Sequence, residues 1–188
     1  MDPELSPEFL DDDQFADLAE AAFSASPLGD VGGGRAAVGM YDYFRSRPGA
    51  NAMVARVDGE IAGFAYGYPD FRWADHTSDW DDLLRDAIGD GHEELEGAYT
   101  VMFLAVSPDF QGEGIGRQLL RAVVPTDAAA AWLATRDAVT AAQGLYASEG
   151  WIEIGRGPLA GPGERSAVLW KAVAPSAMGA SRPSSGTG

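Results

Sequence analysis

The sequence predicts one α/β domain (also described as α+β), because strand-like and helix-like segments alternate along most of its 188 residues. Two runs of strand-forming residues, 52–57 and 61–68, flank an Asp-Gly pair, which is typical of a β-hairpin. An apolar run over 98–106 leads through a glycine-rich loop into a helical pattern. Segments 151–156 and 166–173 predict a final pair of strands.

The remaining elements follow from local patterns along the chain. Apolar residues at helical spacing predict a helix within 8–24, and the aspartates at 11–13 favour the positive end of a helix that starts near them. Five of the eight residues over 27–34 are Gly or Pro, which predicts a loop before a second helix or turn over 36–45. Further predicted elements are a short helix over 79–88, the helix that Pro125 ends, a strand over 128–135 whose first four residues could instead extend that helix, and a helix over 138–149 capped by Gly150.

The composition is that of a globular protein with a strong acidic excess. Asp and Glu number 29 against 13 Lys and Arg, which gives a formal net charge of −16. A field of this sign repels the phosphates of nucleic acids and anionic membranes, so neither is expected as a partner. The amino terminus lacks the pattern of a signal peptide, and no apolar run approaches the roughly 20 residues that span a bilayer. We therefore expect a soluble, cytoplasmic protein.

Metal and thiol chemistry are not expected. The sequence contains no Cys, which excludes disulfides, thiolate metal sites and a Cys nucleophile. The only two histidines, His76 and His92, lie 16 residues apart without the spacing of a helical metal site.

Residues 111–117 have the composition of a phosphate-binding loop. They contain three glycines within five positions at the start of a helix, followed by Arg117 in its first turn. Glycines let the backbone approach phosphates, and the unpaired N–H groups of a helix start face the anion. Without a purpose, each glycine would cost the helix about 1 kcal/mol. An ordinary strand-to-helix turn remains an alternative, whereas the spacing excludes the Rossmann and Walker fingerprints.

A longer stretch around this loop resembles a known family. Residues 104–120 are similar to the central signature of the GNAT superfamily of acyl-CoA-dependent N-acyltransferases: an apolar strand, Val-x-Pro, Gln/Arg-x-x-Gly-x-Gly/Ala and a helix. Residues 142–151 resemble its second element, a Leu-Tyr pair followed by Gly and an aromatic residue. The resemblance implies a mixed central sheet with splayed strands, flanked by helices. It places one acetyltransferase domain over 1–172. The remaining residues, 173–188, are rich in Ser, Gly and Pro, which predicts a disordered tail.

The resemblance also implies a site for acetyl-CoA as co-substrate. Backbone groups of Leu104, Ala105 and Val106 would lie along the pantetheine arm, and an N–H near Val106 would polarise the thioester carbonyl. The residues implied to hold the pyrophosphate and adjoining parts are Gln111, Gly112, Glu113, Gly114, Ile115, Gly116, Arg117 and Gln143. Glu113 departs from the family pattern, since many members have Lys, Arg or a small residue at this position. An acid beside phosphates is unfavourable unless its side chain points to solvent.

Tyr146 matches the position whose phenol, in many family members, protonates the departing thiolate. A phenol with a pKa near 10 can serve a thiolate with a pKa near 8.5 if the two are held within hydrogen-bond distance. Residue type alone favours an aromatic side chain on a buried helix face. The resemblance therefore implies Tyr146 as the catalytic residue.

The implied activity is transfer of an acetyl group to a primary amine of a small molecule, by direct attack in a ternary complex. Two alternatives remain: a non-catalytic acyl-CoA-binding or regulatory module, and a protein-modifying acetyltransferase that acts on Lys or amino termini. The branch that acetylates protein amino termini is disfavoured, because Ala134 and Val139 stand where it often has a carboxylate and an Asn. Dimers are common on this fold, so a homodimer is left open.

The sequence does not single out a general base for the amine. The candidates are Tyr99 and Thr100 on the central strand, and His76, Asp79, His92, Glu93, Glu94 and Glu96 in the acidic insertion over 70–97. We expect this insertion near the acceptor side. If its acidic run borders the cleft, it would select cationic amines such as polyamines or aminoglycosides.

Overall fold

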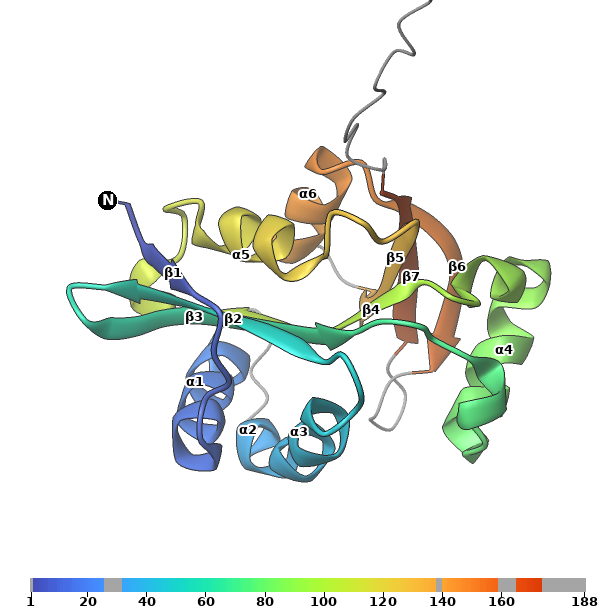
Figure 1. Cartoon of the computed structure of the whole chain (residues 1–188), viewed down its shortest axis with the longest axis horizontal. Coiled ribbons are helices and arrows are strands. Elements are labelled where there is room, and N and C mark those ends of the chain that lie inside the picture. The colour runs from blue at the N-terminus through green and yellow to red at the C-terminus, as the bar shows by residue number, and fades with distance from the viewer. Residues whose placement is uncertain (1, 26–31, 138–139, 159–164, 174–188) are drawn as a thin grey trace, which may run out of the picture.

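The computed structural model describes residues 2–25, 32–137, 140–158 and 165–173, which form a mixed sheet flanked by helices (Figure 1). The strands are β1 (Glu4–Ser6), β2 (Asn51–Val57), β3 (Glu60–Tyr68), β4 (Tyr99–Val106), β5 (Ala130–Arg136), β6 (Ile152–Pro158) and β7 (Arg165–Ala172). The α-helices are α1 (Asp12–Ser24), α2 (Gly33–Ala36), α3 (Val38–Arg45), α4 (Asp79–Ile88), α5 (Ile115–Val123) and α6 (Ala141–Ser148). Within these ranges the sheet has seven strands in the order β1-β2-β3-β4-β5-β7-β6, and only β4 and β5 pair in parallel.

The predicted hairpin is confirmed as β2 and β3. Its turn residues Asp58 and Gly59 have φ angles of 51° and 86°, the positive values that a tight hairpin turn requires. The structure adds β1, which the sequence patterns did not indicate. This strand has three residues and pairs antiparallel with β2 at the edge of the sheet.

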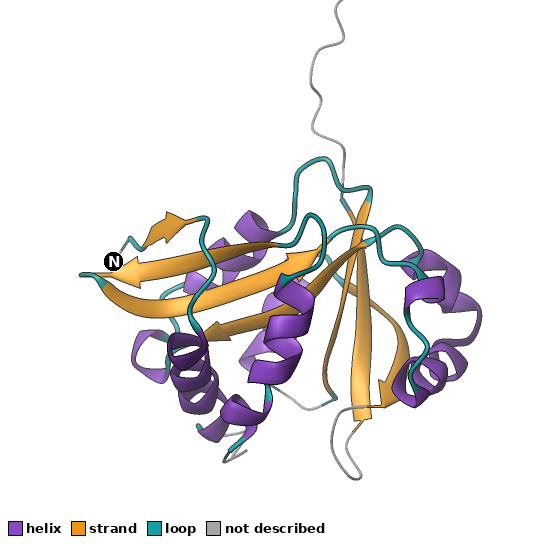
Figure 2. Cartoon of the chain, turned by 60° about the horizontal axis from the view of Figure 1, so that its bottom comes forward, coloured by secondary structure: helices purple, strands orange, loops and turns teal. Residues whose placement is uncertain are grey.

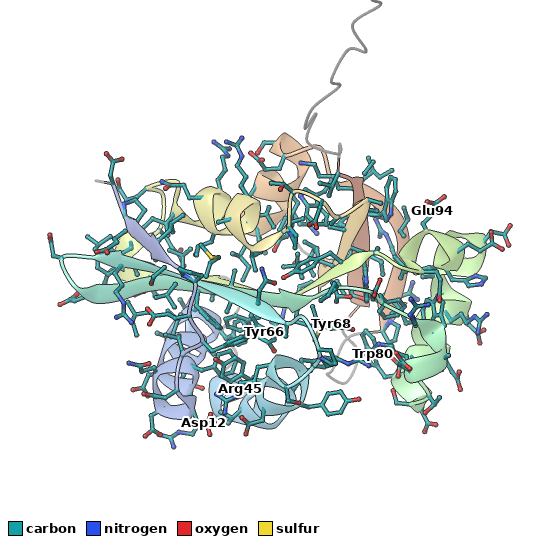
Figure 3. The ribbon with its side chains drawn as sticks, viewed as in Figure 1. Asp12, Arg45, Tyr66, Tyr68, Trp80 and Glu94 are labelled. Atoms are coloured by element: carbon teal, nitrogen blue, oxygen red, sulfur yellow. The ribbon has the colours of Figure 1, made fainter. Side chains whose placement is uncertain are left out.

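Helices cover both faces of the sheet, as the two views show (Figure 1, Figure 2). On one face, α5 and α6 enclose a core that includes Leu119, Leu120 and Tyr146. On the other face, α1 and α3 enclose an aromatic core in which Phe15 stacks on Tyr41 with ring centroids 4.0 Å apart. The inward-pointing side chains of both layers fill the space between helices and sheet (Figure 3).

Helix α1 starts where the run of aspartates predicted it. Asp11 is the N-terminal cap, and its carboxylate accepts the N–H of Gln14 at 2.8 Å. Gln14 accepts the N–H of Asp11 in return at 3.2 Å, which completes a capping box. Asp12 and Asp13 lie in the first turn, where the helix dipole favours negative charge.

Helix α4 has the predicted bounds and packs against β6 at the far end of the sheet. Two glycines of β6 permit this close approach. A Cβ on Gly155 would lie 2.6 Å from Ile88, and a Cβ on Gly157 would lie 2.7 Å from Leu84. Leu84 and Ile88 belong with Trp132 of β5 to a third core cluster, which anchors the insertion.

Some boundaries differ from the prediction. The loop expected over 27–34 gives way to α2 at Gly33, because this segment packs on α1, and residues 26–31 lie outside the described part. The helix expected from 138 begins at Ala141, since Thr140 caps it with its side chain. Strand β5 runs two residues later at its start than expected and ends at Arg136. Residues 138–139 and most of the expected tail, 174–188, also lie outside the described part.

No helix in the part of the chain that the structure describes has both the length and the apolar content needed to cross a membrane.

Candidate active site

Strands β4 and β5 run side by side for only a short distance. Their parallel pairing is confined to two residue pairs near the start of both strands, Tyr99 with Ala131 and Thr100 with Trp132. Both strands continue beyond the second pair. Figure 2 shows that the strands on the two sides of this junction run in different directions. The sheet therefore opens between β4 and β5, which confirms the predicted splay.

The second half of β4 presents backbone groups to this opening. Ser107, just after the strand, donates its N–H to the Ala62 carbonyl of β3 at 2.9 Å. Because the direction of N–H and C=O groups alternates along a strand, those of Val106 and Leu104 point away from β3. The side-chain amide of Gln111 donates to the Val106 carbonyl at 3.2 Å, which agrees with that direction.

The glycine-rich loop brings a row of backbone N–H groups to the same opening. Gly112 and Gly114 have φ angles of 85° and 79°, a left-handed conformation that favours glycine. Gly114 is the N-terminal cap of α5, and no side chain caps the helix there. Within the described part of the chain, the N–H groups from Gly112 to Gly116 bond no acceptor. An uncapped helix start of this kind favours an anion.

Arg117 contributes positive charge beside the loop, although it is paired. Its Nε lies 3.0 Å from a carboxylate oxygen of Glu149, and its guanidinium donates to Ser148 Oγ at 3.1 Å. Arg121 donates two hydrogen bonds to the same carboxylate, at 2.8 and 2.9 Å. The hydrogen bonds from Arg121, with the charges of both arginines, hold the pKa of Glu149 below its usual value against the opposing effect of burial. The three charged side chains carry one net positive charge.

Tyr146 is buried on α6, with 6% of its surface exposed, and it lines the cleft. Burial raises the pKa of its phenol, so the group stays protonated near neutral pH. Its ring packs on Trp151 at a centroid distance of 6.1 Å. The hydroxyl makes no hydrogen bond with the described residues, and its oxygen is not fully buried. A protonated, unbonded phenol therefore faces the cleft.

The opening widens into a cleft of about 1100 Å³ that contains most of the predicted cofactor residues. Those that line it are Leu104, Ala105, Val106, Gln111, Gly112, Gly114, Ile115, Gly116 and Arg117. Glu113 and Gln143 are not part of the lining. The Glu113 side chain is exposed. Gln143 donates its side-chain amide to the Arg136 carbonyl at 3.0 Å, which fixes the start of α6.

The opposite wall of the cleft comes from the end of α1, from α2 and from the start of α3. Its side chains include Phe23 and Met40. The sequence predicted a second helix or turn over 36–45 but gave no sign that this segment borders a site. Their role as a wall depends on how the segment folds back against α1, and no local pattern reports such a contact.

The acidic insertion does not reach this cleft. None of the described lining residues comes from 70–97, although this segment was expected on the acceptor side. Helix α4 instead packs on β6, on the other side of the junction between β4 and β5 (Figure 1). The two tight glycine contacts from β6 to Leu84 and Ile88 explain this position.

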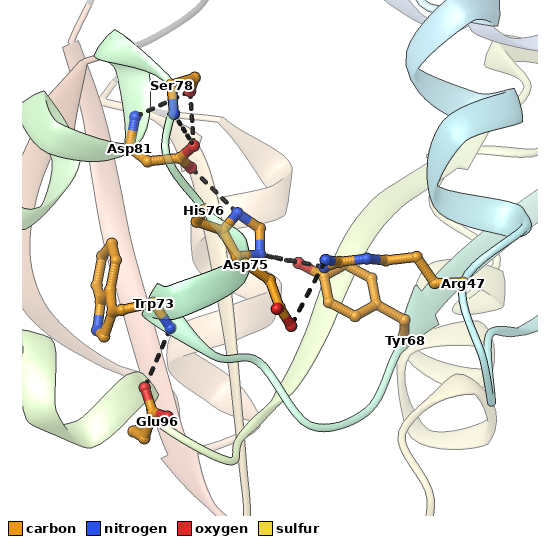
Figure 4. A network of polar contacts seen from close by, with 8 residues as sticks. All are labelled: Arg47, Tyr68, Trp73, Asp75, His76, Ser78, Asp81 and Glu96. Atoms are coloured by element: carbon orange, nitrogen blue, oxygen red, sulfur yellow. Dashed lines mark hydrogen bonds and ion pairs between the residues drawn. The ribbon is translucent and has the colours of Figure 1, made fainter.

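The polar residues of the insertion bond one another (Figure 4). Arg47 lies 3.1 Å from His76 Nε2, and an arginine can only donate, so this nitrogen accepts. His76 Nδ1 therefore carries the proton and donates to Asp81 at 3.2 Å. Asp81 also accepts the hydroxyl and the N–H of Ser78, at 2.6 and 3.0 Å, and Tyr68 adds a contact to Nε2 at 3.3 Å. Both ring nitrogens of His76 are in use.

The other candidate bases also lie outside the described lining. Tyr99 donates its hydroxyl to the Asn51 side chain, and Thr100 is 1% exposed. In the insertion, His92 contacts the Gly89 carbonyl at 2.7 Å, and Glu96 accepts the N–H of Trp73 at 3.1 Å. The remaining candidate bases, which also do not line the described cleft, are Asp79, Glu93 and Glu94. Within the described residues, no group of three or more His, Asp or Glu is placed to hold a metal ion.

Comparisons with known proteins agree with this geometry. The sequence matches the acetyltransferase (GNAT) family over residues 14–151. A structure from Corynebacterium glutamicum, described as histone acetyltransferase HPA2 and related acetyltransferase, superposes with a TM-score of 0.63. It is 22% identical, and the match covers 93% of this chain and 98% of that one. The ribosomal-protein-S18-alanine N-acetyltransferase of Escherichia coli gives a TM-score of 0.58 at 18% identity, covering 91% and 94%.

A third similar structure, from Salmonella typhimurium, was solved with its cofactor acetyl-CoA. It superposes with a TM-score of 0.56 at 16% identity, and the match covers 90% of this chain and 94% of that one. No protein of curated function matches the sequence. Fold and site together define an acyltransferase with a splayed central sheet. The chain belongs to the GNAT acetyltransferase family, and it is an acetyl-CoA-dependent acetyltransferase.

Proposed function

We propose that this chain transfers the acetyl group of acetyl-CoA to a primary amine of a small molecule, by direct attack in a ternary complex. The opening between β4 and β5 carries the proposal. It gathers the unbonded N–H groups of the loop, the backbone of Val106 and the phenol of Tyr146 around one cleft. Residues 1–172 act in this proposal as one acetyltransferase domain.

The loop suits the pyrophosphate of acetyl-CoA. Its N–H groups over 112–116 lack acceptors within the described part of the chain, and phosphate oxygens accept several charge-assisted hydrogen bonds at once. These contacts offset the repulsion from the net charge of −16, because salt screens distant charges over about 8–10 Å. Gln111 and Arg117 flank the loop. The exposed Glu113 side chain is not part of the lining, so its acid does not oppose the phosphates.

The strand provides the second set of contacts. Backbone groups of Leu104 and Val106 point away from β3, which supports pairing with the pantetheine arm, and Ala105 lines the same wall. The N–H of Val106 donates to the thioester carbonyl oxygen in this proposal. The hydrogen bond of Gln143 to the Arg136 carbonyl supports a structural role at the start of α6, in place of direct contact.

Bound acetyl-CoA supplies a thioester whose carbonyl carbon a neutral amine attacks, so that a C–N bond forms and the C–S bond breaks. The N–H of Val106 stabilises negative charge on the carbonyl oxygen. Tyr146, kept protonated by its buried position, donates a hydrogen bond and then its proton to the departing sulfur. The amine nitrogen gives up one proton, which restores the phenol through solvent. The products are the acetylated amine and the free thiol of coenzyme A.

Two measurements test the proposal. Isothermal titration with acetyl-CoA should show saturable binding, and a screen of small primary amines should release thiol only when both substrates are present. Binding without thiol release for any amine would contradict transfer to small molecules and support a non-catalytic acyl-CoA-binding module. Acetylation of Lys side chains or amino termini in a lysate, without turnover of small amines, would indicate a protein acceptor.

A further inference from the structure

The cleft passes through the sheet and has two differently built ends. On one face it is bounded by the glycine-rich loop and by α6, which supply N–H groups and Arg117. On the other face it is bounded by α1, α2 and α3. Residues 101–106 of β4 and 133–136 of β5 lie between the two ends. If the first end holds the phosphates, as proposed above, the second end receives the amine.

The side chains at this second end are apolar. Among the described residues they include Ala22, Phe23, Ala36, Ala37 and Met40. Phe23 packs against Phe103 of β4 with ring centroids 5.6 Å apart, which fixes its ring at the wall. Met40 is 48% exposed, so its flexible side chain borders the mouth.

Carboxylates and imidazoles are absent from the described lining of the cleft. The nearby acid of α1, Glu20, is engaged at the start of α2, where its two oxygens accept the N–H groups of Gly32 and Gly34 at 2.7 and 3.1 Å. The acidic insertion lies beyond the junction of β4 and β5. The expected selection of cationic amines by residues 93–96 therefore has no structural basis among the described residues.

A wall whose described side chains are apolar and include no carboxylate treats the two forms of an amine differently. Moving an ammonium ion from water to apolar surroundings is costly unless an opposite charge compensates, whereas the neutral amine enters at much lower cost. The neutral form is also the nucleophile that attacks the thioester. Desolvation by the wall can thus provide the reactive form without a dedicated general base among the described lining residues.

We propose that the acceptor is a primary amine carried on an apolar body, such as an arylalkylamine, bound in its neutral form against Phe23 and Met40. This inference rests on the proposed transfer function and names its substrate class. A polyamine fits poorly, because a second ammonium group would lie against the same wall without a partner among its described residues.

The first test compares phenylethylamine with putrescine at equal pH and saturating acetyl-CoA, with thiol release as the readout. We expect kcat/KM to favour phenylethylamine by at least about tenfold, the discrimination that burial of an apolar group provides. An equal or larger kcat/KM for putrescine would overturn the inference and leave the transfer function intact. No thiol release with any amine of the screen would overturn both.

The second test introduces a charge at the mouth. Met40→Glu places a carboxylate on the wall at a half-exposed helical position, so we expect the ratio of kcat/KM for phenylethylamine to putrescine to fall about tenfold. Leu83→Glu is the matched control, because Leu83 is a similarly exposed apolar residue on α4, outside the lining of the cleft. It should leave the ratio unchanged. The same ratio in Met40→Glu as in the control would contradict an acceptor site at this wall.

Discussion

Two regions of the molecule use their polar groups in opposite ways. At the opening between β4 and β5, the N–H groups from Gly112 to Gly116 and the hydroxyl of Tyr146 form no hydrogen bonds with the described residues. In the acidic insertion over 70–97, both ring nitrogens of His76 and both oxygens of Asp81 have partners (Figure 4). The first region is built to receive a ligand, whereas the second is already satisfied internally.

This difference concerns the titratable residues of the insertion, which were predicted as candidate bases. A buried polar group without a partner costs free energy, so polar residues that fold together usually bond one another. His76 and Asp81 follow that rule and hold the insertion in place. The groups that remain available lie beside the opening between β4 and β5. The loop contributes N–H groups of a helix start, which have no partner within the helix, and the separation of the strands leaves backbone groups of β4 unpaired.

The largest expected effect is on catalysis by Tyr146. Tyr146→Phe removes the proposed acid, so kcat should fall about 100-fold or more, within the range that general acid catalysis provides. The free energy of unfolding should change little, because the hydroxyl bonds none of the described residues. Steady-state thiol release and urea unfolding measure the two quantities.

Tyr99→Phe is the matched control for that variant. Its hydroxyl donates to Asn51, so this variant should lose about 1 kcal/mol of unfolding free energy while kcat stays close to that of the parent. A large loss of kcat in Tyr99→Phe, with none in Tyr146→Phe, would reverse the assignment of the two phenols.

The next effect concerns the loop. Gly114→Ala forces a side chain into the left-handed conformation at φ 79°, which costs about 1 kcal/mol and shifts the N–H groups from their positions. We expect acetyl-CoA affinity to weaken about tenfold by isothermal titration. Gly59→Ala imposes the same kind of strain at φ 86° in the hairpin turn, with no neighbour near the added Cβ. It should reduce stability and leave affinity unchanged; weaker binding in both variants would show that strain alone is responsible.

A smaller effect is expected from the charge beside the loop. Arg117→Ala should weaken acetyl-CoA binding about threefold at low salt. The difference in affinity should shrink as added salt screens the attraction between Arg117 and the phosphates of the cofactor. Arg121→Ala provides the control, because Arg121 binds the same Glu149 carboxylate but does not line the cleft. Equal losses in the two variants would mean that general charge, and not contact with the cofactor, determines affinity.

The smallest expected effect on catalysis comes from His76, whose contribution is to stability. Burial lowers the pKa of His76 from its ordinary value of 6.5, and Arg47 adds to this against the opposing charge of Asp81. The unfolded chain therefore binds a proton at a higher pH than the folded chain does. The contribution of neutral His76 is fully present above about pH 6.5 and is lost as the pH falls toward the folded-state pKa.

The Tm of the parent protein should fall between pH 8 and pH 5, in part because of His76. In His76→Gln that part should be missing, so the fall in Tm should be smaller for this variant. Its kcat at neutral pH should match that of the parent, because His76 does not line the cleft. His92→Gln, in the same segment but outside the network, should not remove it. A large loss of kcat in His76→Gln at a pH where the protein is folded would restore His76 as a candidate base.

Much of the local structure could be predicted because its causes are local. The hairpin follows from Asp58-Gly59, and the bounds of α4 follow from Ser78 as cap and from its apolar spacing. Strand β1 could not be predicted, since three residues carry too little pattern and the strand exists only by pairing with β2. The position of α4 was equally hidden, because it depends on Gly155 and Gly157, far along the chain.

The sequence by itself determined the order of strand, glycine-rich loop and helix, and with it the family and the use of acetyl-CoA. These properties depend on residues that are neighbours along the chain. Only the tertiary structure decided which polar groups are available for chemistry and what surrounds the acceptor. Hydrogen-bond partners such as Arg47 for His76, and walls such as Met40 opposite the loop, come from distant segments. Their contacts arise from packing and strand separation, which no local pattern records.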